Sequence, residues 1–279
     1  MSVRCLPGDS GIAVAQTATA PRGPSGLWEG WFDLIDRNRA EEPDWLTPLV
    51  TSSPRLSNGF RFDELFEHKA GGLTLANYGN GKGLQMIVFD KTELDLDAPP
   101  YEVESGAKTA MRGFGDWPSF NLKYRFLSAT EAHGDYVVSG YLQTVSPTGA
   151  SSLSNHATMI SPGIAAGKGW GDFNVQANAG AAFPLRNQAR LGDATIANIA
   201  AEYRIGSYLW PELELNETYW PNGGKAGENQ LYVTSGIQLG RIPLYDRLKL
   251  QLGIGYRYAP GAAKAGDEHG WIVSMRLVW

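Results

Sequence analysis

The sequence predicts an all-β protein, an antiparallel transmembrane β-barrel of about twelve strands with a short N-terminal periplasmic segment. Three observations favour this fold class. Long segments alternate strictly between apolar and polar residues, the connections between them alternate between short and long, and aromatic residues gather where the segments end. All three features are typical of barrels that cross an outer membrane.

The alternation is clearest in DRLKLQLGIGYRY, residues 246–258, where the leucines, the isoleucine and the tyrosines share one face. The other face carries arginine, lysine, glutamine and glycine. This segment is thirteen residues long, whereas a strand in a globular protein has about 5–6. At about 3.3 Å per residue and a tilt of about 45°, such a strand spans a bilayer core. Eleven strands are predicted in this way: 57–68, 84–96, 118–130, 134–145, 157–167, 171–183, 193–205, 209–219, 229–241, 246–258 and 270–279.

An even number of strands, which is usual for these barrels, requires one more. We assign it to WLTPLVTS, residues 45–52, although Pro48 removes one ladder hydrogen bond. Asp90 interrupts the apolar face of the strand 84–96, and a bulge at residues 89–91 would restore the alternation.

The connections differ in length on the two sides of the predicted barrel. Long segments at 97–117, 146–155, 184–192, 220–228 and 259–269 alternate with short ones at 131–133, 168–170, 206–208 and 242–245. Short turns lie on the periplasmic side of outer-membrane barrels, so both termini are expected there. The last strand, which ends on Trp279, would close the barrel against the first. It also resembles the C-terminal signal that the outer-membrane assembly machinery reads, which makes this machinery an expected partner.

Aromatic residues are expected to form two girdles, because Trp and Tyr favour the membrane–water interfaces. The girdle by the short turns would hold Trp170, Trp210, Tyr245 and Trp279. The girdle by the long loops would hold Phe183, Tyr219, Trp220, Tyr256, Tyr258 and Trp271.

The composition and the net charge limit the classes of protein to consider. Charged residues make up 19% of the chain, below the usual ~25%. No run approaches the ~18 apolar residues of a transmembrane helix. The single cysteine, Cys5, excludes an internal disulfide and a Cys-based metal site, and the net charge of -5 gives no basic field for nucleic acid. We expect a bacterial outer-membrane protein with the lipid bilayer and lipopolysaccharide as partners, and with no nucleic acid, cofactor or metal.

The N-terminal region divides into two predicted parts. Residues 1–26 are rich in Ala, Pro, Gly, Ser and Thr, which predicts a disordered leader. Alternatively, they are the tail of a truncated signal peptide, because Ala13, Val14 and Ala15 have the form of a signal-peptidase site. Residues 27–44 are expected to form a short helix or a plug, since their apolar residues have helical spacing. The barrel would then occupy residues 45–279.

Several stretches resemble one known family. They are PDWLTPLVTSSPRL (43–56), NYGNGKGLQ (77–85), GDWPSFNLKYRF (115–126), SPGIAAGKGWGDFNVQANAG (161–180) and LWPELELNETYWPNGG (209–224). Together they resemble the outer-membrane "transporter" proteins of the phenol-degradation MetA-pathway family. The resemblance spans about residues 43–279 and implies a barrel that passes small, often aromatic, hydrophobic compounds. It carries no catalytic motif, and this chain departs from the family in lacking a full signal peptide at its start.

Ten charged residues face the lumen by the alternation and mark the expected solute pathway. They are Lys123, Arg125, Glu202, Arg204, Glu212, Glu214, Arg247, Lys249, Arg257 and Arg276. The acidic strand 209–219 would oppose basic strands across the lumen, and the resulting field would select polar or anionic solutes. Alternatively, these charges pair with one another and fill a narrow lumen, because eight-stranded barrels are filled by side chains and open pores are clear only at 16–18 strands.

We therefore predict a channel or transporter for small solutes, including hydrophobic or aromatic compounds, that works by passive diffusion. An enzyme is not expected, because the four histidines have no metal-site spacing and no G-x-S-x-G elbow is present. One alternative is a non-conducting structural or ligand-binding barrel, in which residues 28–42 plug the lumen with Trp28, Trp31 and Phe32. Another is a soluble β-sandwich, which would need no detergent for extraction.

Overall fold

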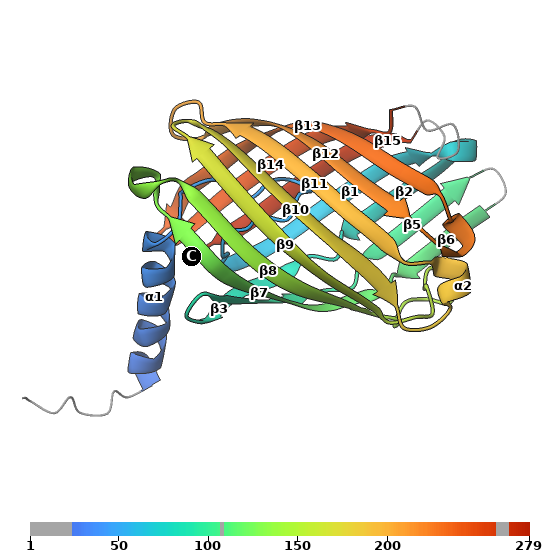
Figure 1. Cartoon of the computed structure of the whole chain (residues 1–279), viewed down its shortest axis with the longest axis horizontal. Helices are drawn as coiled ribbons and strands as arrows, with labels where there is room; N and C mark the ends of the chain where they lie inside the picture. Colours follow the sequence, from blue (N-terminus) through green and yellow to red (C-terminus); the bar gives the residue numbers. More distant parts are fainter. Residues whose placement is uncertain (1–23, 107–108, 261–267) are drawn as a thin grey trace, which may run out of the picture.

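The computed structural model describes residues 24–106, 109–260 and 268–279, which form a closed barrel with one helix at its end (Figure 1). The barrel closes where the first strand pairs antiparallel with the last, from Gly59 opposite Val278 to His68 opposite His269. Closure by the last strand is therefore confirmed, but its partner is the predicted strand 57–68 and not residues 45–52, which were expected to form the first strand. The described strands are β1 (Gly59–Lys69), β2 (Leu73–Gly79), β3 (Gly83–Phe89), β4 (Thr92–Asp97), β5 (Tyr101–Gly106), β6 (Thr109–Phe114), β7 (Trp117–Ala129), β8 (Tyr136–Ser146), β9 (Met159–Trp170), β10 (Phe173–Pro184), β11 (Ala194–Tyr203), β12 (Leu209–Trp220), β13 (Glu228–Tyr245), β14 (Leu248–Tyr258) and β15 (His269–Val278).

These segments make a barrel of twelve antiparallel strands, as predicted, because three of the strands are interrupted. β2 continues into β3, β4 into β5, and β6 into β7, and both halves of the first two broken strands keep pairing with their neighbours. The break between β2 and β3 falls on Gly79, Asn80 and Gly81, all with positive φ. Glycine and asparagine tolerate this left-handed conformation best, so the NYGNGKG stretch forms the kink.

The predicted source of the twelfth strand was wrong. Residues 45–52 form no strand and run through the interior of the barrel. The predicted strand 84–96 is instead two strands, β3 and β4, which meet at a tight turn where Lys91 has a φ of 58°. This turn explains the break in alternation at Asp90, and an irregularity in the pairing of β3 with β4 lies just before it, between Ile87 and Phe89. The predicted long loop at 97–117 was also wrong, since it contains β5 and β6.

The barrel is apolar outside and polar inside, the reverse of a soluble domain. On β14, Gln251 is 6% exposed and faces inward, whereas Leu252 and Ile254 are 39% and 45% exposed. Large apolar side chains stand outward in the same way along the other strands. Exposing this apolar surface to water costs free energy, whereas exposing it to lipid does not, so the molecule is an outer-membrane barrel. No helix within the described ranges is long and apolar enough to cross a membrane.

The aromatic girdles are partly as predicted. Trp170 and Tyr245 are exposed near the short turns, and Tyr219, Tyr258 and Trp271 are exposed nearer the long loops. Trp210 was predicted in the girdle but is only 4% exposed, because it points inward. It packs there against Trp45, Leu46 and Val137.

Short turns and both described chain ends lie at one end of the barrel, which we call the turn end. The helix α1 (Pro24–Ala40) projects from it beside the C-terminus (Figure 1). Longer connections at 147–158, 185–193 and 221–227 lie at the opposite, loop end. The signal-peptidase pattern at residues 13–15 lies outside the described residues, as does the side chain of Trp28.

Candidate functional site

Residues 42–58 follow α1, turn into the barrel and fill its interior near the turn end; we call them the plug. Trp45, Leu46 and Leu49 of the plug are almost completely buried. This is the stretch predicted as a strand, so the plug lies directly C-terminal to the segment 28–42 that was considered for this role. Trp31 and Phe32 on α1 are not part of the plug but pack against the cluster of Ile35, the plug residue Leu56, and Ile87 of β3.

Inward-facing glycines make the space that the plug occupies. A Cβ atom added to Gly253 would lie 2.6 Å from a Leu49 methyl group, and one added to Gly236 or Gly255 would lie within 2.8 Å of it. In the same way, a Cβ at Gly167 would lie 2.6 Å from the Trp45 ring. At each of these distances a Cβ atom would force Leu49 or Trp45 to shift, so the glycines let the plug pack closely against the wall.

Side chains of the barrel wall bind the backbone N–H groups of the plug. Glu214 on β12 accepts hydrogen bonds from Val50 at 2.8 Å and from Thr51 at 2.6 Å. Asn178 on β10 accepts the next N–H, from Ser52, at 3.1 Å. The plug has no strand partner, so these acceptors replace the ladder that a sheet would supply.

Cations of the wall bind the carbonyl groups of the plug. Arg61 donates to Leu49 O at 2.5 Å, and Arg276 donates to Pro48 O at 2.8 Å and also to Thr47 O. Lys123 donates to Arg55 O at 3.2 Å. A guanidinium that holds two adjacent carbonyls fixes the path of the chain, and the prolines at 43, 48 and 54 restrict it further.

A buried ionic network joins the plug to the end of α1. Arg125 is fully buried and donates to Asn38 O at 2.6 Å, to Glu41 at 2.6 Å and to Glu42 at 3.2 Å. Glu42 also pairs with Arg55 at 3.5 Å and accepts the Leu56 N–H at 3.1 Å. The two ends of the plug are therefore held by the same carboxylate.

Glutamine amides on the barrel wall link the carboxylates on the acidic side of the lumen to one another. Gln176 donates to Glu202 at 2.9 Å, and Gln238 donates to Glu212 at 2.7 Å and to Glu202 at 3.3 Å. Both amides also donate to plug carbonyls, those of Leu46 and Thr47. No group of three or more His, Cys, Asp or Glu side chains in the described ranges could hold a metal ion.

The structure places the ten charged residues singled out above in three zones. Six are buried inside and contact the plug or its immediate neighbours: Lys123, Arg125, Glu202, Glu212, Glu214 and Arg276. Arg257 pairs with Glu67 at 3.2 Å, nearer the loop end. Lys249 lines a cavity at the turn end, where Arg204 pairs with Asp172 at 2.9 Å and Arg247 pairs with Asp36.

The pair between Asp36 and Arg247 fastens α1 against the turn of β13 and β14. Arg247 donates to both oxygens of Asp36, one of them at 2.9 Å, and its guanidinium lies 4.7 Å from the centre of the Phe32 ring. The hydrogen bond from Arg247 lowers the pKa of Asp36 below its usual value. The same bond raises the pKa of Arg247.

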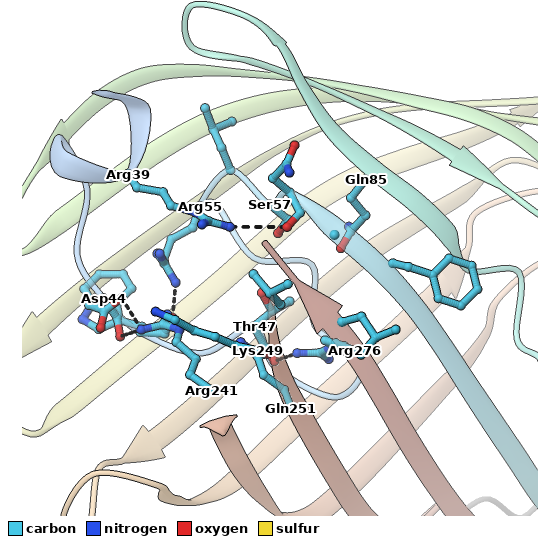
Figure 2. Close-up of a pocket in the computed structure, with 17 residues that line it drawn as sticks. Arg39, Asp44, Thr47, Arg55, Ser57, Gln85, Arg241, Lys249, Gln251 and Arg276 are labelled. Carbon is cyan, nitrogen blue, oxygen red and sulfur yellow. Dashed lines mark hydrogen bonds and ion pairs between the residues drawn. The ribbon is translucent and has the colours of Figure 1, made fainter. Parts of the chain in front are cut away.

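Two cavities adjoin the plug. The mouth cavity, of about 90 Å³, lies at the turn end between the plug, α1 and the ends of β13–β15 (Figure 2). The inner cavity, of about 60 Å³, lies between the plug and the strands β3, β4, β7 and β8. Thr47, Ser57 and Gln85 line both cavities, so the two cavities are neighbours on either side of these residues.

Several of these residues were missed in the sequence. They are the plug residues Glu42, Asp44 and Arg55, and the wall residues Arg61, Glu93, Gln176, Gln238 and Arg241. Two signals could have found the plug. Three prolines within twelve residues disfavour a strand, and glycines recur at inward positions of β13 and β14.

The structure resembles solved outer-membrane barrels at low sequence identity. The COG4313 outer membrane channel from Pseudomonas putida F1 matches with a TM-score of 0.54 and 14% identity, covering 84% of this chain and 99% of that chain. The NanC porin matches with a TM-score of 0.53 and 10% identity, covering 78% of this chain and 100% of that chain. No protein-family model and no curated protein matches the sequence. At these identities, the comparison establishes the barrel fold.

Proposed function

We propose that this protein is an outer-membrane channel for small polar solutes, in which the plug sets the size of what passes. The observation that carries the proposal is that the mouth cavity and the inner cavity lie beside the plug and share the lining residues Thr47, Ser57 and Gln85. A route for solutes beside the plug would run through these two cavities, whose linings are rich in polar groups. The channel and the porin that share the fold support the same role.

The character of the interior favours polar over aromatic solutes. The buried side chains of the wall are mainly charged groups and amides, and the apolar side chains inside belong mostly to the plug or contact it. Passage of an aromatic compound, as the family resemblance implies, would require the plug to move. Small polar solutes can instead exchange hydrogen bonds with the lining residues.

The test is single-channel conductance in planar bilayers for three chains. The first is the whole protein, the second lacks residues 24–40, and the third lacks residues 24–56 and therefore the plug. Each is first shown to be folded by its heat-modifiable migration in gels. We expect a small conductance for the whole protein, little change without α1, and a several-fold increase without the plug. Equal conductance with and without the plug would refute the size-limiting role.

A second candidate, a non-conducting barrel that serves as a structural or binding protein, is favoured by the density of plug contacts. The wall binds consecutive N–H groups from Val50 to Ser52 and the carbonyls of Thr47, Pro48 and Leu49. This candidate predicts no conductance for the whole protein and discrete conductance only for the chain without the plug. The same recordings therefore decide between the two.

A further inference from the structure

The mouth cavity is strongly cationic. Five of its lining side chains are cations and one is a carboxylate: Arg39, Arg55, Arg241, Lys249 and Arg276 against Asp44 (Figure 2). Arg241 pairs with Asp44, and Arg55 pairs with Glu42 just behind the lining, which leaves three cations. We propose that this cavity binds a small carboxylate anion, such as a short-chain monocarboxylate, and this proposal rests on the channel function proposed above.

Three of the five cations have no carboxylate partner among the described residues. Arg39 donates only to the backbone carbonyl of Asn58, at 3.3 Å. Arg276 donates to backbone carbonyls of the plug and to the Gln238 amide oxygen at 3.3 Å. Lys249 is exposed at the mouth, and its ammonium group has no hydrogen-bond or ion-pair partner in the described part of the chain.

Two buried arginines have donors to spare. Arg55 and Arg276 are more than nine-tenths buried, and the Nε–H of each has no acceptor within the described ranges. A buried donor without an acceptor is costly, and a carboxylate is the acceptor that guanidinium geometry matches best. The crowding of positive charge is also visible at Arg39, whose pKa is lowered by burial and by the neighbouring Arg55.

The shape and lining of the cavity limit the anion. A volume of about 90 Å³ is several times the ~10–15 Å³ that one water needs, so it accommodates an anion the size of acetate. Leu56 and Val278 line part of the wall and would contact an alkyl group. Phosphate and sulfate have no apolar part to place there, so the mixed lining favours a monocarboxylate.

The test is a titration of ¹³C-labelled acetate against the detergent-folded full chain, followed by the line width and chemical shift of the acetate signal. We expect saturable binding with a dissociation constant in the millimolar range. Lys249→Gln is the informative variant because Lys249 has no hydrogen-bond or ion-pair partner to lose among the residues that the structure describes. It should weaken binding at least fivefold, and Lys249→Arg should restore it. Arg190→Gln, an exposed cation at the loop end, is the matched control and should leave binding unchanged.

Three results would overturn the proposal. The first is no saturable binding of acetate, and the second is equal binding by the wild type and Lys249→Gln. The third is displacement of acetate by phosphate at a concentration below the dissociation constant of acetate. The titration does not depend on conductance, so the two proposals can fail separately. Saturable, Lys249-dependent binding in a barrel that does not conduct would support the site and refute the channel. Conductance without acetate binding would refute the site alone.

Discussion

The Glu214 carboxylate accepts the backbone N–H of Thr51 at 2.6 Å, although 163 residues separate the two in the chain. The same carboxylate accepts the N–H of Val50 at 2.8 Å. The barrel wall thus satisfies the backbone of a segment that belongs to no sheet, and the segment becomes a fixed part of the interior. How firmly it is fixed determines what the barrel can pass.

We expect Glu214→Ala to loosen the plug. Two buried N–H groups would lose their acceptor, at a cost of about 1–3 kcal/mol for each group. Only the plugged state bears this cost, so states with a displaced plug should become more populated. Single-channel recordings should then show larger or more frequent openings than the wild type.

The control for this variant is Glu217→Ala. Glu217 lies on the same strand but is exposed and has no plug contact, so its removal should leave the conductance unchanged. If Glu214→Ala folds normally and conducts like the wild type, the plug does not depend on this carboxylate.

Arg125→Met should release α1 and the start of the plug. The fully buried guanidinium holds Asn38 and Glu42, and its removal would leave the buried Glu42 carboxylate with a weaker set of partners. Breaking a buried pair from one side costs about 3–5 kcal/mol. We expect trypsin to cleave after Arg37 and Arg39 at least tenfold faster than in the wild type. The control variant Arg186→Met, which changes an exposed position of the loop end, should be cleaved by trypsin at the wild-type rate.

The docking of α1 should depend on pH through Asp36. Its pKa in the folded protein is lowered, first of all by the hydrogen bond from Arg247. The stabilising contribution is therefore complete above the unfolded-state pKa, about 3.9 for an aspartate, and is lost as the pH falls through the lowered folded-state value. A carboxyl ¹³C NMR titration should give a pKa for Asp36 below the ordinary value, and Arg247→Gln should return it toward that value. An ordinary Asp36 pKa in the wild type would contradict the pairing. The pair is largely exposed, so its effect on overall stability should be small.

The wall of the barrel could be predicted from the sequence because lipid and a polar interior impose a simple rule on alternate residues. Strands such as β14 and β15 obey the rule along their whole length, so their limits and facing were predictable. The interrupted strands were harder to predict, because a kink at Gly79–Gly81 and a turn at Lys91 both break the alternation. Sequence alone does not distinguish a bulge from a turn at such breaks.

The plug could not be predicted from alternation, because its contacts are long-range and individual. Leu49 packs over glycines of β13 and β14, and Thr47 is bound by Arg276 near the end of the chain. From the sequence alone, a glycine at an inward position indicates only a residue that disfavours a strand, because the plug residue that packs against it is not known. The alternation along each strand was enough to predict which charged residues are candidates for the lumen, whereas their contacts with the plug could be identified only from the structure.

The C-terminal residue should matter for both closure and assembly. Trp279 donates its backbone N–H to Asn58 O at 3.3 Å, and the Asn58 amide donates to Trp279 O at 3.3 Å. Asn58 also accepts the Ile87 N–H at 3.1 Å, so it joins β3 to the closing strand. Asn58→Ala would remove both side-chain bonds at the seam, and we expect a lower unfolding midpoint in urea for the detergent-folded protein.

Removal of Trp279 should chiefly reduce the amount of barrel in outer-membrane fractions, because the last strand carries the expected assembly signal, and Trp279→Phe should preserve that amount. Normal membrane levels without Trp279 would show that the terminal aromatic residue is not part of the signal.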